Sequence, residues 1–451
     1  MAWEYTLGEL TKVVHGKLNG NKHAVFSGVS TDTRTIKPGN IFFALPGNKV
    51  DGHQFVQEAI NKGAIAVIVS KETNESSIYV PNTLYALQQF ARWHRTNLKA
   101  NIFAITGSCG KTTTKELVYS VLNKKYKVVA SKGNYNNELG CPLSLLQMDE
   151  ETEWGIIEMG AGKPGDIAEL CAIAYPEESG ITTIAPAHLE RLGSIDGVAK
   201  EKANIAKCLP PWGSFYVNKD DPYCVSIANR ILVPKIYFGQ NGDISIKSIQ
   251  RVSDSKLKVE VEPVGVFNLP LCSRAYLSNF LFAIAVSFKH QIPADEKSLC
   301  DAYERAGRIR IYKIGELFII DDSYNANPAS MNSALEYLSL IAPQGYRCAV
   351  LGDMLELGEA SGQYHFSLGK EIANYGVDNL FLYGNYANEI AKGAKLGGVP
   401  KIYIGSTHED IADKLLNIIQ PQSFVLVKGS RGMTMEKVIE TLKRKIGLIN
   451  E

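Results

Sequence analysis

The chain has 451 residues, too many for one hydrophobic core, and at roughly 100 to 200 residues per domain its length predicts three domains. Its 48 basic and 47 acidic side chains nearly cancel, so overall charge gives no argument for nucleic acid or a membrane as a partner. The start, MAWEYTLGEL, lacks the pattern of a secretory signal, and apolar runs such as FLFAIAV are too short to span a bilayer. The eight cysteines include no C-x-x-C pair, which argues against a zinc site and a disulfide framework. We therefore expect a cytoplasmic protein whose cysteines are mostly small buried residues.

The first part of the chain, residues 1–82, has the pattern of a compact α/β unit. Buried strands are predicted at NIFFAL and AIAVIV, and a helix that ends at Gly63 is predicted at HQFVQEAINKG.

The second part, residues 83–306, opens with an amphipathic helix, NTLYALQQFARWHR. It continues with apolar runs separated by helix-length segments, which is typical of a parallel sheet with crossover helices: NIFAIT, KVVA, WGIIEM, GITTIA, GSFYVN and KIYFG. Near residues 243–262 the period changes to two, which predicts a small antiparallel addition to that sheet.

The third part, residues 307–451, repeats the alternation and predicts an open α/β, Rossmann-like domain. Its predicted strands are LFIID, RCAVLG, NLFLYG, KIYIG and SFVLVKG.

A glycine-rich segment, TGSCGKTTTKE at residues 106–116, lies between an apolar run and a helix-length segment. Such a loop can hold phosphate, because the first turn of a helix presents free N–H groups and the positive end of its dipole. The strict P-loop spacing would place glycine at position 105, where the chain has Ile105, so only the shorter G-x-x-G-K-T-T pattern remains. We expect Lys111 to act as a point charge on phosphate and Thr112 as a magnesium ligand. The alternative is a glycine-rich turn with an exposed lysine.

Two polar residues follow other apolar runs of the second part. Ligands bind beyond the carboxyl ends of strands in such sheets, so Glu158 and His188 are expected on the side of Lys111. Both side chains are possible magnesium ligands beside phosphate, histidine being the less usual one. Each also has a structural interpretation, Glu158 as a helix-start carboxylate and His188 as a hydrogen-bonded core residue.

Six segments together closely resemble the Mur ligases: AITGSCGKTTTKE, GNYNNELGCPLSLL, EMGAGKPGDIA, APAHLERLGSIDGVAKEKANI, DDSYNANPASM and LGDMLELGE. The resemblance extends from STDTRTIKPGNIFFALPGNKVDGHQF to VKGSRGMTMEKVI and so covers almost the whole chain. Within the family it is strongest for the branch that adds D-alanyl-D-alanine to UDP-N-acetylmuramoyl-tripeptide. It implies a small UDP-binding domain, a central ATP-binding domain with a P-loop-like cradle, and a C-terminal ligase domain.

The resemblance also implies roles for individual residues. ATP phosphates would be held by Gly107, Ser108, Cys109, Gly110, Lys111, Thr112 and Thr113. Two magnesium ions would be held by Thr112, Glu158, His188 and Lys202, the last as a carbamylated lysine. Asn279 would lie against adenine, and Arg308 and Asp322 would reach the nucleotide. Asn325 and Asn327 would lie near the reacting centre, and the UDP end of the substrate would be held by Ser30, Thr33, Arg34, Asp51 and His53.

The chain departs from the pattern of the family in three places, at four residues. Cys109 replaces a usual asparagine, Thr183 stands where asparagine is common, and Ala275 and Tyr276 replace a His-Asn pair. A phosphate cradle works through backbone N–H groups, so the first change is expected to be tolerated. The details of the adenine pocket stay open.

The sequence also leads to expectations about the chemical reactivity of two side chains, Cys109 and Lys202. A thiol at a helix N-terminus beside a lysine can have a lowered pKa, so Cys109 is either a reactive thiol or an inert side chain. Lys202 lies on a predicted helix with Ile205 and Ala206 nearby, which indicates partial burial, and burial favours the neutral amine that captures carbon dioxide.

The expected reaction passes the γ-phosphate of ATP to a substrate carboxylate, and the amine of D-alanyl-D-alanine then displaces phosphate. The partners would be these two substrates, without nucleic acid or membrane insertion, and the protein would be a monomer. The alternatives are another ligase of the family, adding a diamino acid to the dipeptide or glutamate to folate, and a non-catalytic nucleotide-binding regulator. The presence of Glu158, His188 and Lys202 argues against the regulator.

Overall fold

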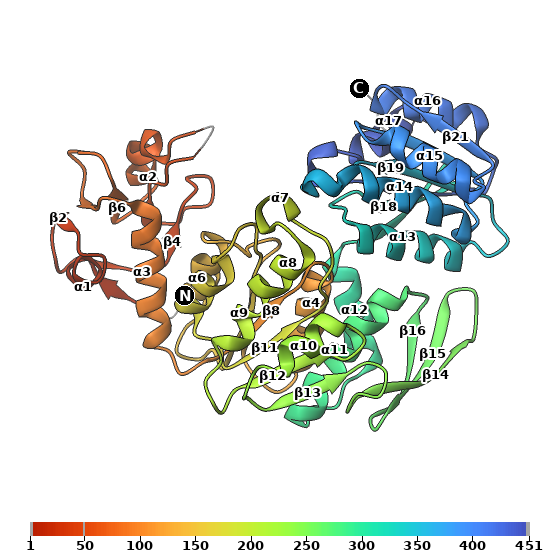
Figure 1. Ribbon diagram of the computed structural model, residues 1–451. Coiled ribbons are helices and arrows are strands. Elements are labelled where there is room, and N and C mark those ends of the chain that lie inside the picture. The colour runs from red at the N-terminus through yellow and green to blue at the C-terminus, as the bar shows by residue number, and fades with distance from the viewer. Residues whose placement is uncertain (1–2, 48–49, 448–451) are drawn as a thin grey trace.

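The structure is a computed structural model that describes residues 3–47 and 50–447. Figure 1 shows three α/β units in chain order, with the central unit between the other two. This arrangement confirms the predicted fold class of three α/β domains with a central parallel sheet. In the described part of the chain, no helix combines the length and apolar character needed to cross a bilayer.

The first unit is built on a five-stranded sheet in which four strands are parallel and β2 is antiparallel. In spatial order the strands are β2 (Lys17–Asn19), β7 (Ser77–Tyr79), β6 (Ala66–Val69), β5 (Ile41–Phe43) and β4 (Val29–Ser30). A separate two-stranded ribbon pairs β1 (Tyr5–Thr6) with β3 (Val25–Phe26). The helices are α1 (Leu7–Val13), η1 (Gly52–Phe55) and α2 (Val56–Asn61).

Helix α3 (Thr83–Thr96) connects the first unit to the central one. It packs against α1 and β5 on one side and against α5 and α6 of the central unit on the other. The predicted amphipathic helix is thus confirmed, and it has apolar neighbours in both units. We propose the boundaries after residues 82 and 306 as the domain limits.

The central unit contains a six-stranded sheet that is parallel throughout. In spatial order it comprises β13 (Lys235–Phe238), β12 (Ser214–Asn218), β11 (Glu178–Ile181), β8 (Asn101–Thr106), β10 (Trp154–Glu158) and β9 (Val128–Ala130). Its helices are α4 (Lys111–Leu122), α5 (Gly140–Leu145), α6 (Asp166–Ala174), α7 (Leu189–Leu192), α8 (Ile195–Lys202), α9 (Asn204–Lys207), α10 (Pro222–Ala228), α11 (Arg274–His290) and α12 (Glu296–Ala306).

The predicted antiparallel addition forms a sheet of its own instead of extending the parallel one. Its strands are β14 (Ser245–Arg251), β15 (Lys256–Glu262) and β16 (Gly265–Pro270). The chain turns at Gly239 and Gly242 directly after β13 and so leaves the parallel sheet. Between β13 and the start of β14, the described residues form one isolated bridge, from Phe238 to Ile244.

The third unit has a six-stranded sheet in which five strands are parallel, as expected, and the unpredicted first strand is antiparallel. The spatial order is β17 (Arg310–Ile314), β18 (Leu317–Asp322), β22 (Phe424–Lys428), β19 (Arg347–Gly352), β20 (Asn379–Tyr383) and β21 (Lys401–Ile404). The helices are α13 (Pro328–Ile341), η2 (Gly358–Ala360), α14 (Ser361–Ile372), η3 (Ala373–Tyr375), α15 (Ala387–Gly397), α16 (His408–Ile418), η4 (Arg431–Met433) and α17 (Glu436–Lys445).

Helix α11 fills the core on one face of the central sheet. Its run FLFAIAV, residues 280–286, is buried on all sides, which explains why the segment shows no polar face. The Phe282 ring stacks on Tyr216 at 5.5 Å and lies 5.1 Å from Phe238. Gly180 of β11 makes room for it, since a Cβ there would lie 2.3 Å from Phe282 Cζ. The ring therefore fixes the distance between α11 and the sheet.

We expect Phe282→Ala to destabilise the central unit by about 3 to 5 kcal/mol, the range for truncating a buried phenylalanine. Phe288→Ala is the matched control on the same helix, because Phe288 is 51% exposed and should cost less than about 1 kcal/mol. Calorimetric melting of the full chain measures both changes. Equal losses in the two variants would contradict this account of the core.

Candidate active site

A cavity of about 1280 Å³ lies where the carboxyl ends of the central strands meet the third unit. Most of the predicted site residues line it: Gly107, Ser108, Cys109, Gly110, Lys111, Thr112, Thr113, Glu158, His188, Lys202, Asn279, Arg308, Asp322, Asn325 and Asn327. They are separated by up to about half of the chain in sequence. The adjacency of β11, β8 and β10 brings together those of the central sheet, and the third unit adds Arg308, Asp322, Asn325 and Asn327. The five predicted residues of the first unit do not line this cavity.

The loop between β8 and α4 depends on two glycines. Gly110, the residue before α4, has φ of +82°, and a Cβ there would lie 2.4 Å from Asn279 Oδ1. A Cβ on Gly107 would lie 1.8 Å from Thr182 Oγ1. Only glycine lets the backbone turn here and pass so close to its neighbours. The first-turn N–H groups of α4 are thereby directed at the cavity, as a phosphate cradle requires.

The residues that follow β11 hold this phosphate loop through hydrogen bonds. Ser108 N donates to Thr183 O at 2.8 Å, and Ser108 Oγ donates to Ala185 O at 2.8 Å. The Thr183 hydroxyl in turn donates to Asp221 Oδ2 at 2.9 Å. Threonine at position 183 thus makes a polar contact of its own where the family pattern has asparagine, and Asp221 is its partner.

Lys111 folds back over the loop, where its Nζ donates to Gly107 O at 2.8 Å. Burial lowers the pKa of its ammonium, and the nearby Glu158 carboxylate opposes that shift. A cation in this position attracts an anion strongly because little water screens it.

Glu158, at the end of β10, is 1% exposed and holds one oxygen toward the loop. Thr112 Oγ1 donates to its Oε2 at 2.9 Å, and Asn136 Nδ2 donates to its Oε1 at 2.8 Å. The interpretation of Glu158 as a helix-start carboxylate is wrong, because the residue ends a buried strand. A hydroxyl and a carboxylate in contact are suitable oxygen ligands for magnesium.

Arg308 reaches this pair from beyond α12. Its guanidinium donates to Thr112 Oγ1 and stacks on the Tyr324 ring, with Cζ 3.8 Å from the ring centre. The stacking fixes the plane of the guanidinium, so the third unit places a permanent positive charge next to the phosphate loop.

Lys202 is the last residue of α8 and is 2% exposed, more buried than the sequence indicated. Burial and the repulsion of Lys111 lower the pKa of its amine to about 7. The neighbouring Glu201 carboxylate accepts hydrogen bonds from Gly165 N and Ile167 N, each at 2.8 Å, and not from the Lys202 amine. Within residues 3–47 and 50–447, no hydrogen bond or ion pair engages the Lys202 amine.

His188 contacts a residue that sequence reasoning did not select. Its Nδ1 is paired with the carboxylate of Glu356, which follows β19 in the third unit. Burial lowers the pKa of the His188 imidazole, and the Glu356 carboxylate opposes the shift. Glu356 lies in LGDMLELGE, one of the segments that resemble the Mur ligases, but the sequence did not indicate its contact with His188.

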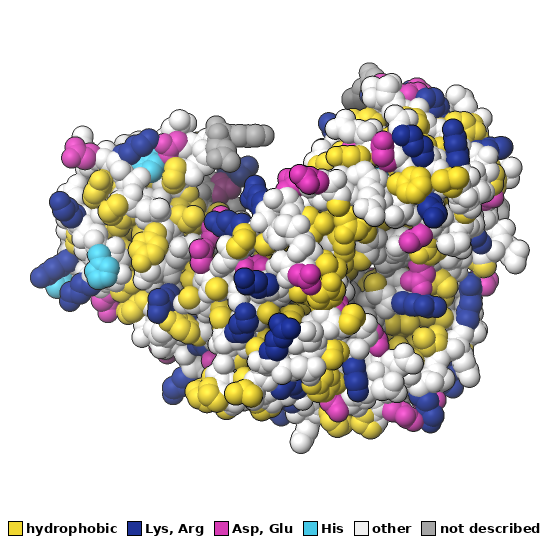
Figure 2. Space-filling model, viewed as in Figure 1, with side chains coloured by type: hydrophobic (Ala, Val, Ile, Leu, Met, Phe, Trp, Pro, Cys, Tyr) yellow, Lys and Arg dark blue, Asp and Glu magenta, His cyan; other side chains and the backbone are white. Residues whose placement is uncertain are grey.

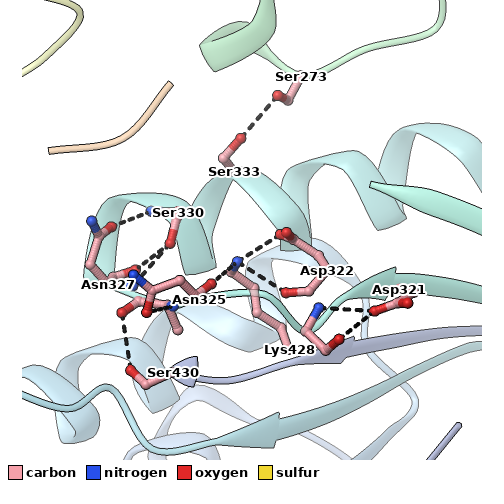
Figure 3. A network of polar contacts seen from close by, with 11 residues as sticks. Ser273, Asp321, Asp322, Asn325, Asn327, Ser330, Ser333, Lys428 and Ser430 are labelled. Atoms are coloured by element: carbon pink, nitrogen blue, oxygen red, sulfur yellow. Dashed lines mark hydrogen bonds and ion pairs between the residues drawn. The ribbon is translucent and has the colours of Figure 1, made fainter. Parts of the chain in front are cut away.

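Figure 3 shows a second group from the third unit, centred on Lys428. The Lys428 ammonium is 2.7 Å from Asp322 Oδ2 and donates to Asn325 O at 2.7 Å. Burial raises the pKa of the Asp322 carboxyl, and Lys428 opposes this shift. Asn327 Nδ2 donates to Ser108 O at 3.2 Å and so touches the phosphate loop itself. Lys428 was missed because its partners lie about a hundred residues earlier in the chain.

The side of the cavity expected to hold adenine is formed by the start of α11 and by α12. Asn279 lies beside Gly110, and Tyr276 packs edge-on against Tyr303 at 4.3 Å. The Tyr276 hydroxyl is buried and finds no partner among the described residues. The ring of Tyr276 therefore contributes packing where the family pattern has a polar side chain.

Cys109 does not have the environment of an activated thiol. Burial raises the pKa of its thiol, and the attraction of Lys111 does not overcome this. The interpretation of Cys109 as an inert side chain is therefore favoured. All eight cysteines are free thiols, and five are buried as expected.

The predicted residues of the first unit form local contacts of their own. Arg34 Nη2 is 2.6 Å from Asp32 Oδ2, and Ser30 Oγ donates to Asp32 O at 2.8 Å. Asp51 Oδ1 accepts from His53, and the bond from Lys71 lowers the pKa of its carboxyl. Thr33 O accepts from Lys62 Nζ at 3.0 Å. Figure 2 shows the surface hollowed between this unit and the other two.

No group of three or more His, Cys, Asp or Glu side chains in the described ranges is placed to hold a metal ion. The predicted magnesium ligands include only Glu158 and His188 of these types, so any ion here would take further oxygens from other groups.

Comparisons with known proteins agree with this geometry. Three domains match in chain order: the Mur ligase family catalytic domain over residues 25–100, the Mur ligase middle domain over 105–287, and the Mur ligase glutamate ligase domain over 307–431. The UDP-N-acetylmuramoyl-tripeptide–D-alanyl-D-alanine ligases of Bacillus subtilis and Escherichia coli are 32% and 33% identical to this chain. Each comparison covers 97% of this chain and 98% of the relative. The chain belongs to the Mur ligase family.

Solved structures of this family match almost the whole chain. The crystal structure of MurF from Acinetobacter baumannii has a TM-score of 0.87 at 29% identity, covering 98% of this chain and 99% of that one. The MurF ligase from Thermotoga maritima, solved in complex with ADP, has a TM-score of 0.80 at 28% identity, with 93% and 98% covered. The resemblance to Mur ligases read from the sequence is therefore confirmed.

We expect Gly107→Ala to weaken binding of a non-hydrolysable ATP analogue at least tenfold, about 1.4 kcal/mol, because the added methyl group displaces the loop from Thr182. Gly362→Ala is the control, since a Cβ at this site in α14 meets no atom closer than 3.9 Å. Calorimetric titration gives both dissociation constants. Unchanged affinity in Gly107→Ala would show that the close approach at this glycine is dispensable.

Proposed function

We propose that the protein is an ATP-dependent ligase that joins D-alanyl-D-alanine to UDP-N-acetylmuramoyl-tripeptide. One observation carries this proposal. The phosphate loop with Lys111 and Thr112, the carboxylate of Glu158 and the guanidinium of Arg308 meet in a single cavity between two units. The relatives that match 97% of this chain are named as ligases of these substrates.

The chemistry explains why ATP is needed. A carboxylate resists attack by an amine, because it is negatively charged, stabilised by resonance, and has no leaving group. Transfer of the γ-phosphate of ATP to the carboxylate gives an acyl phosphate and ADP. The free amine of D-alanyl-D-alanine then attacks the acyl carbon, the C–O bond breaks, and inorganic phosphate leaves as the amine gives up a proton.

The residues of the cavity would serve the transfer through charge and position. Lys111 and Arg308 would face the β- and γ-phosphates, where negative charge must be stabilised during in-line transfer. Thr112 and Glu158 would hold one magnesium ion, and their contact at 2.9 Å fits an oxygen-lined cation site. His188 and Lys202 would hold a second. Bound magnesium supplies positive charge to the phosphate oxygens.

Lys202 would serve its ion as a carbamate. The observations that fit are a 2% exposed amine, without a hydrogen bond in the described chain, whose pKa is about 7. A neutral amine combines with carbon dioxide and gives up a proton, which leaves an anionic group that can coordinate magnesium. The positive neighbour Lys111 would favour that negative charge.

The substrates would occupy the space on either side of the phosphate loop. The UDP end would lie on the first unit at Ser30, Thr33, Arg34, Asp51 and His53. Asn325 and Asn327 would lie near the reacting carboxylate, and the contact of Asn327 with Ser108 O supports this. Adenine would lie between Asn279 and the third unit, near Asp322. The substrates must enter before the third unit closes over them.

The direct test incubates the protein with ATP, magnesium and D-alanyl-D-alanine, together with the UDP-linked tripeptide containing either lysine or diaminopimelate. The pentapeptide product and an equal amount of phosphate are expected. Product formed only from the dipeptide and a diamino acid, or from folate and glutamate, would identify another ligase. ATP binding without any product would indicate a regulator.

Lys111→Ala and Glu158→Ala should each lower turnover at least a hundredfold, the order of magnitude for losing one preorganised electrostatic contact. Lys125→Ala, just beyond the far end of α4, is the control and should leave turnover unchanged. Steady-state phosphate release measures all three. Near-normal turnover in either cavity variant would remove that residue from the mechanism.

Lys202→Ala should abolish ligation, and acetate should partly restore it by supplying a carboxylate in the vacated space. Lys200→Ala is the matched control, because Lys200 is exposed on the same helix. Full activity of Lys202→Ala in buffer depleted of carbon dioxide would contradict the carbamate.

The pKa of Lys202 also sets a pH dependence. Its neutral amine is scarce below about pH 7 and becomes the main form above it, so at a fixed concentration of dissolved carbon dioxide depleted enzyme should recover faster at about pH 8 than at about pH 6. Reactivation is followed as the rate at which phosphate release recovers. A rate that does not rise with pH would show that Lys202 is not the group that captures carbon dioxide.

A further inference from the structure

The loop that follows β19 crosses from the third unit to α7 of the central unit. Its Glu356 carboxylate is paired with His188 Nδ1, and Glu356 O accepts from Glu190 N at 3.3 Å. Both the side chain and the backbone of Glu356 therefore contact one turn of the chain, residues 188–190.

The backbone on both sides of this contact is held in an unfavourable conformation. His188 has φ of +53° and Glu356 has φ of +63°, a region that costs an ordinary residue about 1 kcal/mol or more. Neither residue is a glycine or an asparagine. The buried side chain of Leu357 anchors the loop, and Gly358 lies against α7, where a Cβ would be in van der Waals contact, 3.5 Å from Glu190 N. The surrounding packing thus enforces the pairing.

The pairing decides which nitrogen of His188 is free. An imidazole that donates its Nδ1 proton to a carboxylate carries a lone pair on Nε2, and that nitrogen can bind a cation. His188 lines the cavity of the phosphate loop. Without the carboxylate, both tautomers and several ring orientations would be open to it.

We propose that Glu356 is a positioning residue: it holds His188 with Nδ1 protonated and Nε2 directed to a divalent cation in the cavity. Because Glu356 belongs to the third unit, this cation site is complete only when that unit has docked. The inference rests on the proposed function, in which the cation serves phosphate transfer. It adds a reason why transfer cannot begin in the open molecule.

The test uses the full-length protein and the variants Glu356→Gln and Glu356→Asp. Glu359→Gln is the matched control, since Glu359 is an exposed carboxylate three residues further along the same loop region. Glu356 is itself 54% exposed at its side chain, so its amide variant should fold, and thermal melting checks this.

The first measurement is the tautomer of His188, read from the ¹⁵N shifts of labelled histidine and assigned by the loss of its signal in His188→Gln. We expect a protonated Nδ1 in the parent protein and in Glu356→Asp. Glu356→Gln should show a mixture or the opposite tautomer. This measurement needs neither ATP nor turnover.

The second measurement is Mn²⁺ binding in the presence of a non-hydrolysable ATP analogue, followed by electron paramagnetic resonance. Glu356→Gln should weaken the lower-affinity Mn²⁺ site about 10- to 100-fold, the range for removing a partner that orients a metal ligand. The site at Thr112 and Glu158 should keep its affinity, and Glu359→Gln should change neither.

Each outcome decides the question. An unchanged tautomer and unchanged Mn²⁺ affinity in Glu356→Gln would overturn the proposal and leave Glu356 as a contact between units only. A single Mn²⁺ site in the parent protein would overturn the cation part. Absence of ligation together with the expected tautomer and Mn²⁺ results would count against the proposed function and leave the positioning role standing.

Discussion

The structure depends on the adjacency of β11, β8 and β10 in the central sheet. Because these strands are parallel, their carboxyl ends deliver Thr182, the phosphate loop and Glu158 to one edge, although about 75 residues separate the first from the second. A flat stack of Phe282 on Tyr216, permitted by Gly180, holds α11 against the same strands and places Asn279 beside Gly110. The positions of Lys111 and Glu158 in the cavity follow from this framework.

The positive groups at that edge come from both the central and the third unit. Lys111 and Lys202 are close enough for their repulsion to lower the pKa of Lys202, and Arg308 adds a third cation from the other unit. Removing an ammonium from water costs several kcal/mol when no anion compensates it. Carboxylates offset part of this charge: Glu158 attracts Lys111, Glu201 attracts Lys202, and Asp322 attracts Arg308. A group of cations beside the phosphate loop is suited to an anionic ligand, which agrees with phosphate transfer.

The sequence predicted the parts of the site that lie within single segments. The loop spacing indicated Gly107 to Thr113, and the polar residues after apolar runs indicated Glu158 and His188. Glu356 and Lys428 lie in segments that carried the family resemblance, but they were not selected, because each acts through a partner 168 or about 100 residues away. The thiol of Cys109 was open to two interpretations, since sequence shows its helix position and cannot show its burial. The antiparallel strands were recognised by their period, but their separation from the parallel sheet depends on the turn after β13.

The contacts between the central and third units are both polar and apolar. Polar contacts join Asn327 with Ser108, Ser333 with Ser273, Arg308 with Thr112, Arg274 with Glu336, Arg251 with Leu340 O, and Glu356 with His188 and Glu190. Leu340 and Ile341 of α13 also pack against the apolar core of the central unit. An exposed ion pair such as Arg274 with Glu336 contributes only about 0 to 1 kcal/mol. A ligand that bridges the two units would add to these contacts. Three of the polar contacts involve Ser108, Thr112 or His188, so the docked position of the third unit bears directly on the phosphate loop and on the predicted metal ligands.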